Sequence, residues 1–214
     1  MARATTPPPT TLLLVRHGVT ASTGKVLPGR APGLHLSPAG REQAHRAAMR
    51  LSELTTVPSA LYASPLERTR ETAAPIAAAL GLKVRIDKGL VECDFGEWTG
   101  RRLSSLRRLA QWRAVQHAPS TFRFPGGESF TEMQLRIWGA LERLSAAHPG
   151  ETVVLVSHAD PIKAAVTYAQ GVPLDLFQRT VISTCSISAV MLTGTTPIVL
   201  SVNNTGSLKE LFPS

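Results

Sequence analysis

Residues 12–20 read LLLVRHGVT, and this stretch decides how the rest of the chain is interpreted. The four apolar residues Leu12 to Val15 are typical of a strand buried on both faces. They run directly into Arg16 and His17, two side chains suited to binding negative charge. Taken alone, this pair is also compatible with a strand that ends in solvent. Other parts of the sequence favour an anion-binding site at the carboxyl end of this strand.

Predicted strands and helices alternate along most of the chain. Apolar runs predict strands over residues 12–15, 60–63, 83–86, 152–158, 186–191 and 198–202. Helical spacing and capping signals predict helices over residues 38–54, 65–80, 130–147 and 161–170. The signals are N-caps at Ser37, Ser64 and Ser129, a C-terminal glycine at Gly81, and a turn at Gly194 and Pro197. This order predicts an α/β fold, a three-layer α/β/α sandwich with a mostly parallel central sheet.

The chain has the size of one ordinary domain. Of its 214 residues 43% are hydrophobic, which suffices for a substantial core. We expect a flexible, proline-rich tail over residues 1–10 and a single domain over 11–214, with 89–128 as a small cap-like insertion. Within that insertion, LSSLRRLAQW has helical spacing. The first apolar run is too short for a signal peptide or membrane span, and the two cysteines lack metal-ligand spacing, so we expect a cytoplasmic protein with reduced thiols.

The charge of the chain indicates an anionic ligand without identifying it. The net charge is +8 and the pI about 10.3. Aromatic residues make up only 5% of the chain, fewer than single-strand nucleic-acid binding favours. We therefore expect a small phosphorylated substrate as the partner, with no nucleic acid and no membrane, and a homodimer is compatible with the sequence.

Basic side chains follow three of the predicted strands. Arg16 and His17 follow the first, Arg68 follows the second, and His158 ends the strand over residues 152–158. Because parallel strands end at the same edge of a sheet, we expect these side chains to share one crevice. Such a cationic pocket would bind an anion of high charge density, and phosphate fits this requirement best.

These residue types suit phosphoryl transfer through a covalent intermediate. A neutral imidazole can attack phosphorus while cationic groups neutralise the equatorial oxygens. A carboxylic acid must then protonate the leaving oxygen, and Glu92 is the best candidate. Asp94 and Glu97 are neighbouring carboxylates that could do the same work.

The sequence resembles the histidine phosphatase superfamily, which includes cofactor-dependent phosphoglycerate mutases and many broad-specificity phosphatases. The resemblance spans about residues 11–211. It rests on four motifs in the order of that superfamily, LVRHGVT, SPLERTRETA, ECDFGEWTG and VSH. It implies a phosphoglycerate mutase-like fold.

The resemblance implies a role for each residue of these motifs. His17 would be the phosphorylated nucleophile, Arg16, Arg68 and His158 would hold the phosphoryl group, and Glu92 would be the acid and base. The backbone amide of Ala159 would also bind phosphate, and neither a metal nor a cofactor would be needed. The candidate substrate- and phosphate-binding residues are Arg16, Thr20, Thr23, Gly29, Arg30, Arg68, His158, Ala159, Arg101 and Arg102.

The chain departs from the superfamily pattern near the expected phosphate. Thr23 stands where the superfamily often has Asn, so one donor is shorter or absent. The second histidine lies in HADPIK, where HGGxIR is common. The introduced Asp160 would repel phosphate unless it points away, and we expect it to cap the helix that it begins. Lys163 is the other substituted position.

Several of these residues also have structural explanations. Arg68 could form a surface salt bridge on its helix, and His158 could be a satisfied core histidine. The basic run from Arg101 to Arg113 is typical of a solvated helix face. Its functional alternative is that Arg101 or Arg102 contacts a second acidic group of the substrate.

The leading hypothesis is a metal-independent phosphomonoesterase that hydrolyses a small phosphorylated metabolite through phosphohistidine at His17. The alternative within the superfamily is a phosphoglycerate-type phosphomutase, which must keep water out. The mutases carry a longer insert between the glutamate motif and the second histidine, so the shorter connection here favours hydrolysis. A third hypothesis, of a different class, is a non-catalytic module that binds phosphorylated ligands or nucleic acid.

Overall fold

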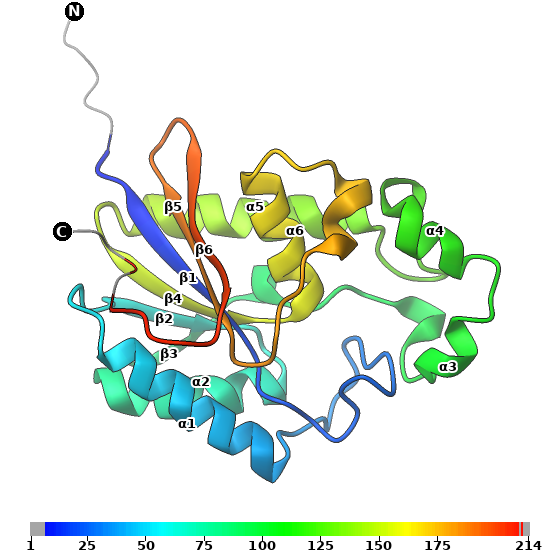
Figure 1. Cartoon of the computed structure of the whole chain (residues 1–214), viewed down its shortest axis with the longest axis horizontal. Helices are drawn as coiled ribbons and strands as arrows, with labels where there is room; N and C mark the ends of the chain where they lie inside the picture. The colour runs from blue at the N-terminus through cyan, green and yellow to red at the C-terminus, as the bar shows by residue number, and fades with distance from the viewer. Residues whose placement is uncertain (1–6, 210, 212–214) are drawn as a thin grey trace, which may run out of the picture.

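In the computed structural model, which describes residues 7–209 and 211, a six-stranded sheet lies between two layers of helices (Figure 1). The strands are β1 (Thr10–Arg16), β2 (Ala60–Ala63), β3 (Val84–Ile86), β4 (Thr152–Ser157), β5 (Ile187–Leu192) and β6 (Pro197–Asn204). The α-helices are α1 (Pro38–Ser52), α2 (Glu67–Leu80), α3 (Leu103–Leu106), α4 (Trp112–His117), α5 (Phe130–Ala147) and α6 (Ala159–Ala169). Short 3₁₀ turns cover Lys88–Leu90, Gly96–Trp98, Pro119–Thr121 and Leu174–Arg179.

The sheet is mostly parallel, as predicted. Its strand order is β3-β2-β4-β1-β5-β6. The first four strands in this order run parallel, whereas β5 runs antiparallel to both β1 and β6. The carboxyl ends of β1, β2 and β4 therefore meet at one edge, where the side chains that follow them can form a single site.

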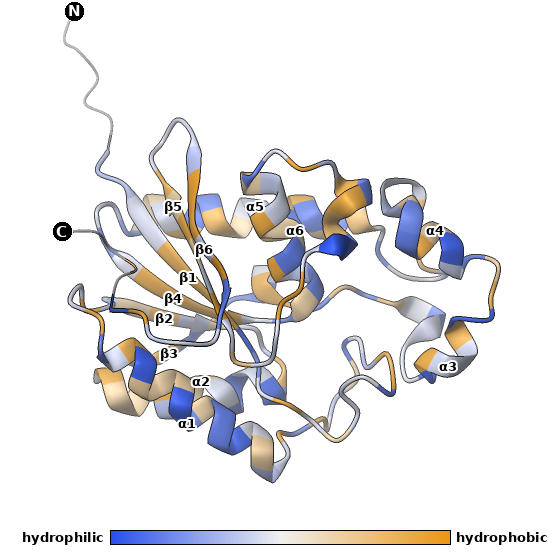
Figure 2. Cartoon of the chain, viewed as in Figure 1, coloured by the Kyte–Doolittle hydropathy of each residue, from blue (hydrophilic) through white to orange (hydrophobic). Residues whose placement is uncertain are grey.

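The central strands β1 and β4 are buried on both faces, which explains their uninterrupted apolar runs in the sequence. Leu12 and Leu14 of β1 pack into the cluster that includes α5 and α6 residues, whereas Leu13 and Val15 pack into the cluster that includes α1 and α2 residues. Figure 2 shows the hydrophobic strands enclosed by helices that keep their hydrophilic residues outward. The predicted three-layer α/β/α sandwich is thus confirmed.

Several predicted helix signals are confirmed. Ser37 caps α1 by accepting from the Gly40 amide at 3.1 Å, and Ser129 with Glu132 forms a capping box at the start of α5. Gly81 ends α2 in the left-handed conformation, with φ of 66°. Among the residues that the structure describes, no helix combines the length and the apolar character needed to cross a bilayer.

Some predicted boundaries were wrong. The predicted tail, residues 1–10, reaches into the fold, because Thr10 is buried and already pairs with β5; residues 1–6 lie outside the described range. The stretch LSSLRRLAQW forms α3, a turn and the start of α4 rather than one helix. Packing of Trp112 on Trp98, with ring centroids 6.3 Å apart, accompanies this break and overrides the local helical spacing. Pro197 begins β6 and does not lie in the turn.

Two predicted N-caps were also wrong. Helix α2 starts at Glu67 with Leu66 as its N-cap residue, because the Ser64 hydroxyl is hydrogen-bonded to His158 instead. Helix α6 starts at Ala159, and Asp160 lies within its first turn, where its carboxylate pairs with Lys163 at 3.2 Å. Neither polar side chain acts as an N-cap, because Ser64 contacts His158 and Asp160 pairs with Lys163 inside α6.

The loop after β1 depends on a close backbone crossing with α1. A Cβ added at Gly40 would fall far inside contact distance of the Val19 carbonyl oxygen. We expect Gly40→Ala to lower the free energy of unfolding by about 1–3 kcal/mol, because the backbone must shift to relieve the overlap. Gly139→Ala on α5, where a Cβ would meet nothing within 4 Å, is the matched control and should raise it by up to about 1 kcal/mol. Urea denaturation measures the free energy of unfolding of both variants, and a Gly40→Ala variant as stable as the wild type would contradict the close crossing.

Candidate active site

His17 lies where β1 ends, and only 6% of its surface is exposed. Its Nδ1 lies 2.8 Å from the Gly18 carbonyl oxygen, which can only accept a hydrogen bond, so Nδ1 carries the ring proton. Burial, together with Arg68 and Arg16, lowers the pKa of His17 to about 3. The imidazole is therefore neutral at physiological pH, and its Nε2 keeps a free electron pair.

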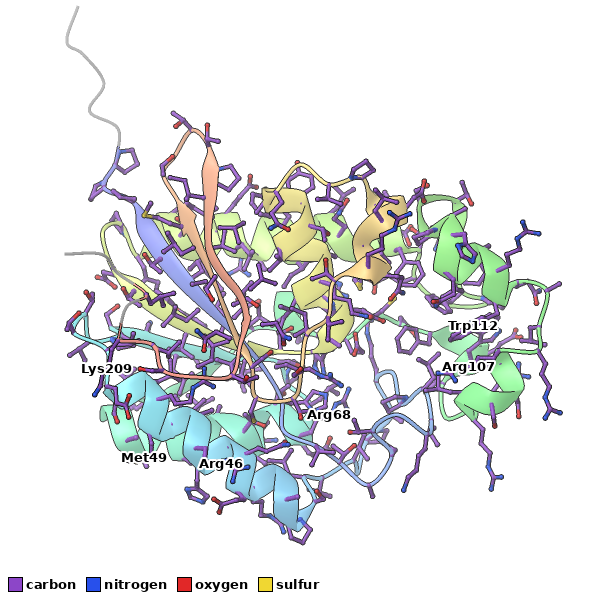
Figure 3. The ribbon with its side chains drawn as sticks, in the orientation of Figure 1. Arg46, Met49, Arg68, Arg107, Trp112 and Lys209 are labelled. Carbon is purple, nitrogen blue, oxygen red and sulfur yellow. The ribbon has the colours of Figure 1, made fainter. Side chains whose placement is uncertain are left out.

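Three cationic or imidazole side chains surround His17. The His158 ring lies edge-on to the His17 ring with centroids 5.2 Å apart, and its Nε2 is 2.8 Å from Ser64 Oγ. Arg68 is fully buried on α2 and donates through Nη2 to the Gly29 carbonyl oxygen at 2.8 Å. Figure 3 shows Arg68 near the carboxyl ends of the strands. Full burial of Arg68 excludes a surface salt bridge. His158 is buried like a core histidine, but its Nδ1 has no hydrogen-bond partner among residues 7–209 and 211.

Four buried nitrogen atoms of these side chains have no hydrogen-bond partner among residues 7–209 and 211. They are Arg16 Nε, Arg68 Nε, Arg68 Nη1 and His158 Nδ1. A buried polar group left unpaired costs about 1–3 kcal/mol, and more when it is charged. The remaining guanidinium contacts orient the side chains, because Arg16 Nη1 donates to the Ile182 carbonyl oxygen at 2.6 Å. The arrangement is costly without a ligand and suits an anion with several acceptor oxygens.

Glu92 is the buried carboxyl group of the site, with 7% of its surface exposed. Its Oε1 accepts from the Cys93 amide at 2.9 Å. Burial and the nearby Asp160 raise the pKa of Glu92 to about 7, against the opposing effect of Arg68 and Arg16. A carboxyl group in this state can both donate and accept a proton near neutral pH.

The two alternative carboxylates are placed differently. Asp94 accepts from the Gly96 amide at 3.0 Å and pairs with Arg30 at 3.5 Å, and Glu97 is exposed. Neither lines the cavity into which Glu92 opens. The structure therefore favours Glu92 among the three.

Ion pairs behind Glu92 hold its loop in place, and sequence reasoning missed most of them. Glu128 pairs with Arg136 at 2.7 Å and with Arg30 at 2.9 Å. Arg30 Nε also donates to the Glu92 carbonyl oxygen at 2.8 Å, and Arg136 Nη1 donates to the Val91 carbonyl oxygen at 2.8 Å. The guanidinium of Arg30, a predicted phosphate ligand, is engaged with this loop and does not line the cavity.

A cavity of about 580 Å³ opens over these residues. Of the predicted site residues, those that line it are Arg16, His17, Thr20, Thr23, Glu92 and Ala159. The Thr23 hydroxyl accepts from the Thr20 amide at 2.9 Å and so shapes the loop after β1. Ala159 begins α6, where amide groups have no intrahelical acceptor and the helix dipole favours an anion.

The remaining predicted residues do not line this cavity, and of these Arg68 and His158 are fully buried next to His17. Gly29 holds Arg68 through its carbonyl oxygen, with φ of 53°. Arg101 and Arg102 are exposed and do not line the cavity, so their contact with the substrate stays a prediction. The turn after α3 places Arg107 at the cavity instead. Asp160 was expected to point away from the phosphate. Instead it lines the cavity together with Lys163.

Within the described part of the chain, no three His, Cys, Asp or Glu side chains are grouped so that they could hold a metal ion. The cationic groups around His17 are instead guanidinium and imidazole groups. They can neutralise an anion by hydrogen bonds and charge.

Comparison with known proteins identifies the family. Residues 12–205 match the model described as the histidine phosphatase superfamily (branch 1). The chain belongs to this superfamily. The predicted enzyme class, a histidine phosphatase, is thereby confirmed.

Relatives and solved structures of histidine phosphatases cover nearly the whole chain. It is 32% identical to phosphoserine phosphatase 1 of Hydrogenobacter thermophilus over 206 residues, 94% of this chain and 95% of that relative. It is 33% identical to the probable phosphoglycerate mutase GpmB of Erwinia tasmaniensis over 180 residues, 83% of this chain and 82% of that relative. The structure of Bacillus stearothermophilus YhfR matches with a TM-score of 0.84 and 26% identity, covering 92% of this chain and 98% of that one. The chain spans only 55% of the length of some Mycobacterium relatives with 34% identity.

Proposed function

We propose that this histidine phosphatase hydrolyses a small phosphomonoester, without a metal ion, through a phosphohistidine at His17. One observation carries the proposal. Beside the neutral imidazole of His17, four buried nitrogen atoms of Arg16, Arg68 and His158 have no hydrogen-bond partner among residues 7–209 and 211. Phosphate oxygens would accept from these nitrogens and remove the cost of leaving them unpaired.

In the first step the Nε2 electron pair of His17 attacks phosphorus. The bond between phosphorus and the ester oxygen breaks, and that oxygen takes the proton of Glu92. Arg16, Arg68, His158 and the Ala159 amide would stabilise the charge on the equatorial oxygens. For His158 to donate from Nδ1, the Ser64 hydroxyl must donate to Nε2, and the distance of 2.8 Å allows this bond.

In the second step water attacks the phosphohistidine. Glu92, now a carboxylate, accepts a proton from the water, and the bond between phosphorus and Nε2 breaks. The electron pair returns to His17, Glu92 is protonated again, and inorganic phosphate leaves. One carboxyl group can serve both steps because its pKa of about 7 keeps both protonation states accessible.

Hydrolysis is favoured over a phosphomutase reaction. The segment between α2 and α5 carries only two short α-helices, α3 and α4, beside the site. A mutase must exclude water from its phosphoenzyme, and so short a cover leaves water free to compete. The relative named as a probable phosphoglycerate mutase keeps the phosphomutase as the second candidate.

A non-catalytic binding module is less consistent with the site. Simple phosphate binding needs the cationic groups but gives no reason for a buried carboxyl group beside them. A small metabolite also fits a cavity of about 580 Å³.

The two cysteines, Cys93 and Cys185, are free and buried, which suits a reducing cytoplasm.

The test is phosphate release from a panel of phosphomonoesters, with and without EDTA. Purified protein should release phosphate from at least one ester at a rate that EDTA does not change. Efficient interconversion of 2- and 3-phosphoglycerate without net phosphate release would favour the mutase. Phosphate binding without any turnover would favour the binding module, and loss of activity in EDTA would contradict metal independence.

A further inference from the structure

The cavity extends beyond the phosphate site toward the cap-like segment 89–128. One end is lined by Arg16, His17 and Ala159. The other end is apolar, and its lining includes Leu27, Phe95, Leu103, Trp112, Val115 and Phe124. Leaving groups of phosphomonoesters project away from the attacking nitrogen, so this apolar end is where the leaving group would lie.

Trp112 gives the apolar end a fixed aromatic wall. Its ring stacks on Trp98 with an interplanar angle of 19°, and Trp98 is buried against Phe122 and Phe124, each with a ring centroid 5.5 Å away. Trp112 is held by this aromatic cluster while still lining the cavity (Figure 3). An aromatic wall fixed in this way suits a planar or apolar group.

Arg107 places a guanidinium at the same end of the cavity. The residue directly follows α3, and its amide donates to the Leu103 carbonyl oxygen at 3.0 Å, which fixes its backbone. Within residues 7–209 and 211, no ion pair involves Arg107. The guanidinium is therefore free to bind an anionic group of a ligand in the cavity.

Negative charge lies on the opposite side, next to the phosphate site. Asp160 follows Ala159 directly and lines the cavity, with 18% of its side chain exposed. Lys163 also lines the cavity, but its ammonium is engaged by two acceptors, Asp160 Oδ1 at 3.2 Å and Gln178 Oε1 at 3.1 Å. A second anionic group close to the phosphate would meet the Asp160 carboxylate, whereas one at the far end would meet Arg107.

We propose that Arg107 and Asp160 select the position of a second anionic group on the leaving group. The preferred substrate is a phosphomonoester whose leaving group has an apolar or planar middle against Trp112 and an anionic far end against Arg107. Esters with a carboxylate beside the phosphate are disfavoured by Asp160. This inference rests on the proposed phosphatase function and names its substrate class.

Three esters test the proposal: the isomers para-carboxybenzyl phosphate and ortho-carboxybenzyl phosphate, and benzyl phosphate as the reference without a carboxylate. For the wild type, kcat/KM should be about 10-fold higher for the para ester than for benzyl phosphate and lower for the ortho ester. In Arg107→Gln the para-to-benzyl ratio should fall to about one, because the cation that binds the carboxylate is gone. Arg108→Gln, an exposed neighbour that does not line the cavity, is the control and should keep the wild-type ratio.

Asp160→Asn tests the repulsive part separately. Its ortho-to-benzyl ratio should rise severalfold, because like-charge repulsion is removed while the size of the side chain is kept. Three results would overturn the assignment of Arg107. The wild-type para-to-benzyl ratio could be one or less, the ratio could stay high in Arg107→Gln, or it could fall equally in Arg108→Gln. An unchanged ortho ratio in Asp160→Asn would overturn that of Asp160. Turnover of none of the three esters would overturn this substrate class, whereas a lack of phosphate release across the whole panel of phosphomonoesters would contradict the proposed function itself.

Discussion

His17→Ala should lower kcat for every phosphomonoester by at least about 10⁴-fold, since the covalent route loses its nucleophile. No other group takes its place, because the His158 ring is held by Ser64 and the other histidines lie elsewhere. The variant should still bind inorganic phosphate, because Arg16, Arg68 and His158 remain in place. Stopped assays of phosphate release measure the first effect, and calorimetric titration with phosphate measures the second.

The control for this variant is His45→Ala. His45 is exposed on α1, and its removal should leave turnover unchanged. Circular dichroism of both variants checks that the fold is retained. Substantial turnover by folded His17→Ala would show that another residue, or water directly, attacks phosphorus.

Glu92→Gln should lower kcat by about 10²- to 10⁴-fold for phosphate esters of alcohols such as benzyl phosphate. The amide keeps the shape of the side chain but has no proton to give to the leaving alkoxide. The loss should be much smaller for p-nitrophenyl phosphate, because p-nitrophenolate leaves without protonation. Glu97→Gln, an exposed glutamate in the same loop, is the matched control and should behave as the wild type. Equal losses for both leaving groups would contradict the role of Glu92 as the acid.

The pH dependence follows from the same two groups. Glu92 is protonated below its pKa of about 7, so kcat/KM should decline as the pH rises above that value. His17 becomes protonated and loses its free electron pair only near pH 3, so the acid limb should lie far lower. Ionisation of the substrate phosphate near pH 6 affects wild type and Glu92→Gln alike, so the difference between their profiles reports Glu92. A basic limb that persists unchanged in Glu92→Gln would argue for a different titrating group.

The reacting end of the site could be predicted because its residues follow directly on regular elements. Arg16 and His17 end β1, and His158 follows β4, so the parallel topology alone brings them together. Buried strands and capping boxes carry strong local signals, as at Ser129. The catalytic core thus depends on local sequence patterns that the global fold does not override.

The residues around this core could not be predicted, because distant contacts decide their roles. Ser64 precedes a proline and a glutamate, a pattern typical of an N-cap. Its hydroxyl bonds His158 instead because β4 pairs with β2 in the folded sheet. Arg30 could be placed only once Glu128 lay beside it, 98 residues further along the chain. Arg107, which follows α3, lines the cavity, and the helical spacing of that segment conceals the turn on which Arg107 lies.

The central claim is that His17 bonds transiently to phosphorus, and rapid quenching with a radiolabelled ester tests it most directly. Wild-type protein mixed with labelled p-nitrophenyl phosphate and quenched in alkali during turnover should carry label on the peptide that contains His17. That label should survive alkali and be lost in mild acid, as expected of a phosphohistidine, and it should be absent from His17→Ala. Turnover without any labelled protein, or an acid-stable label on another residue, would contradict the account.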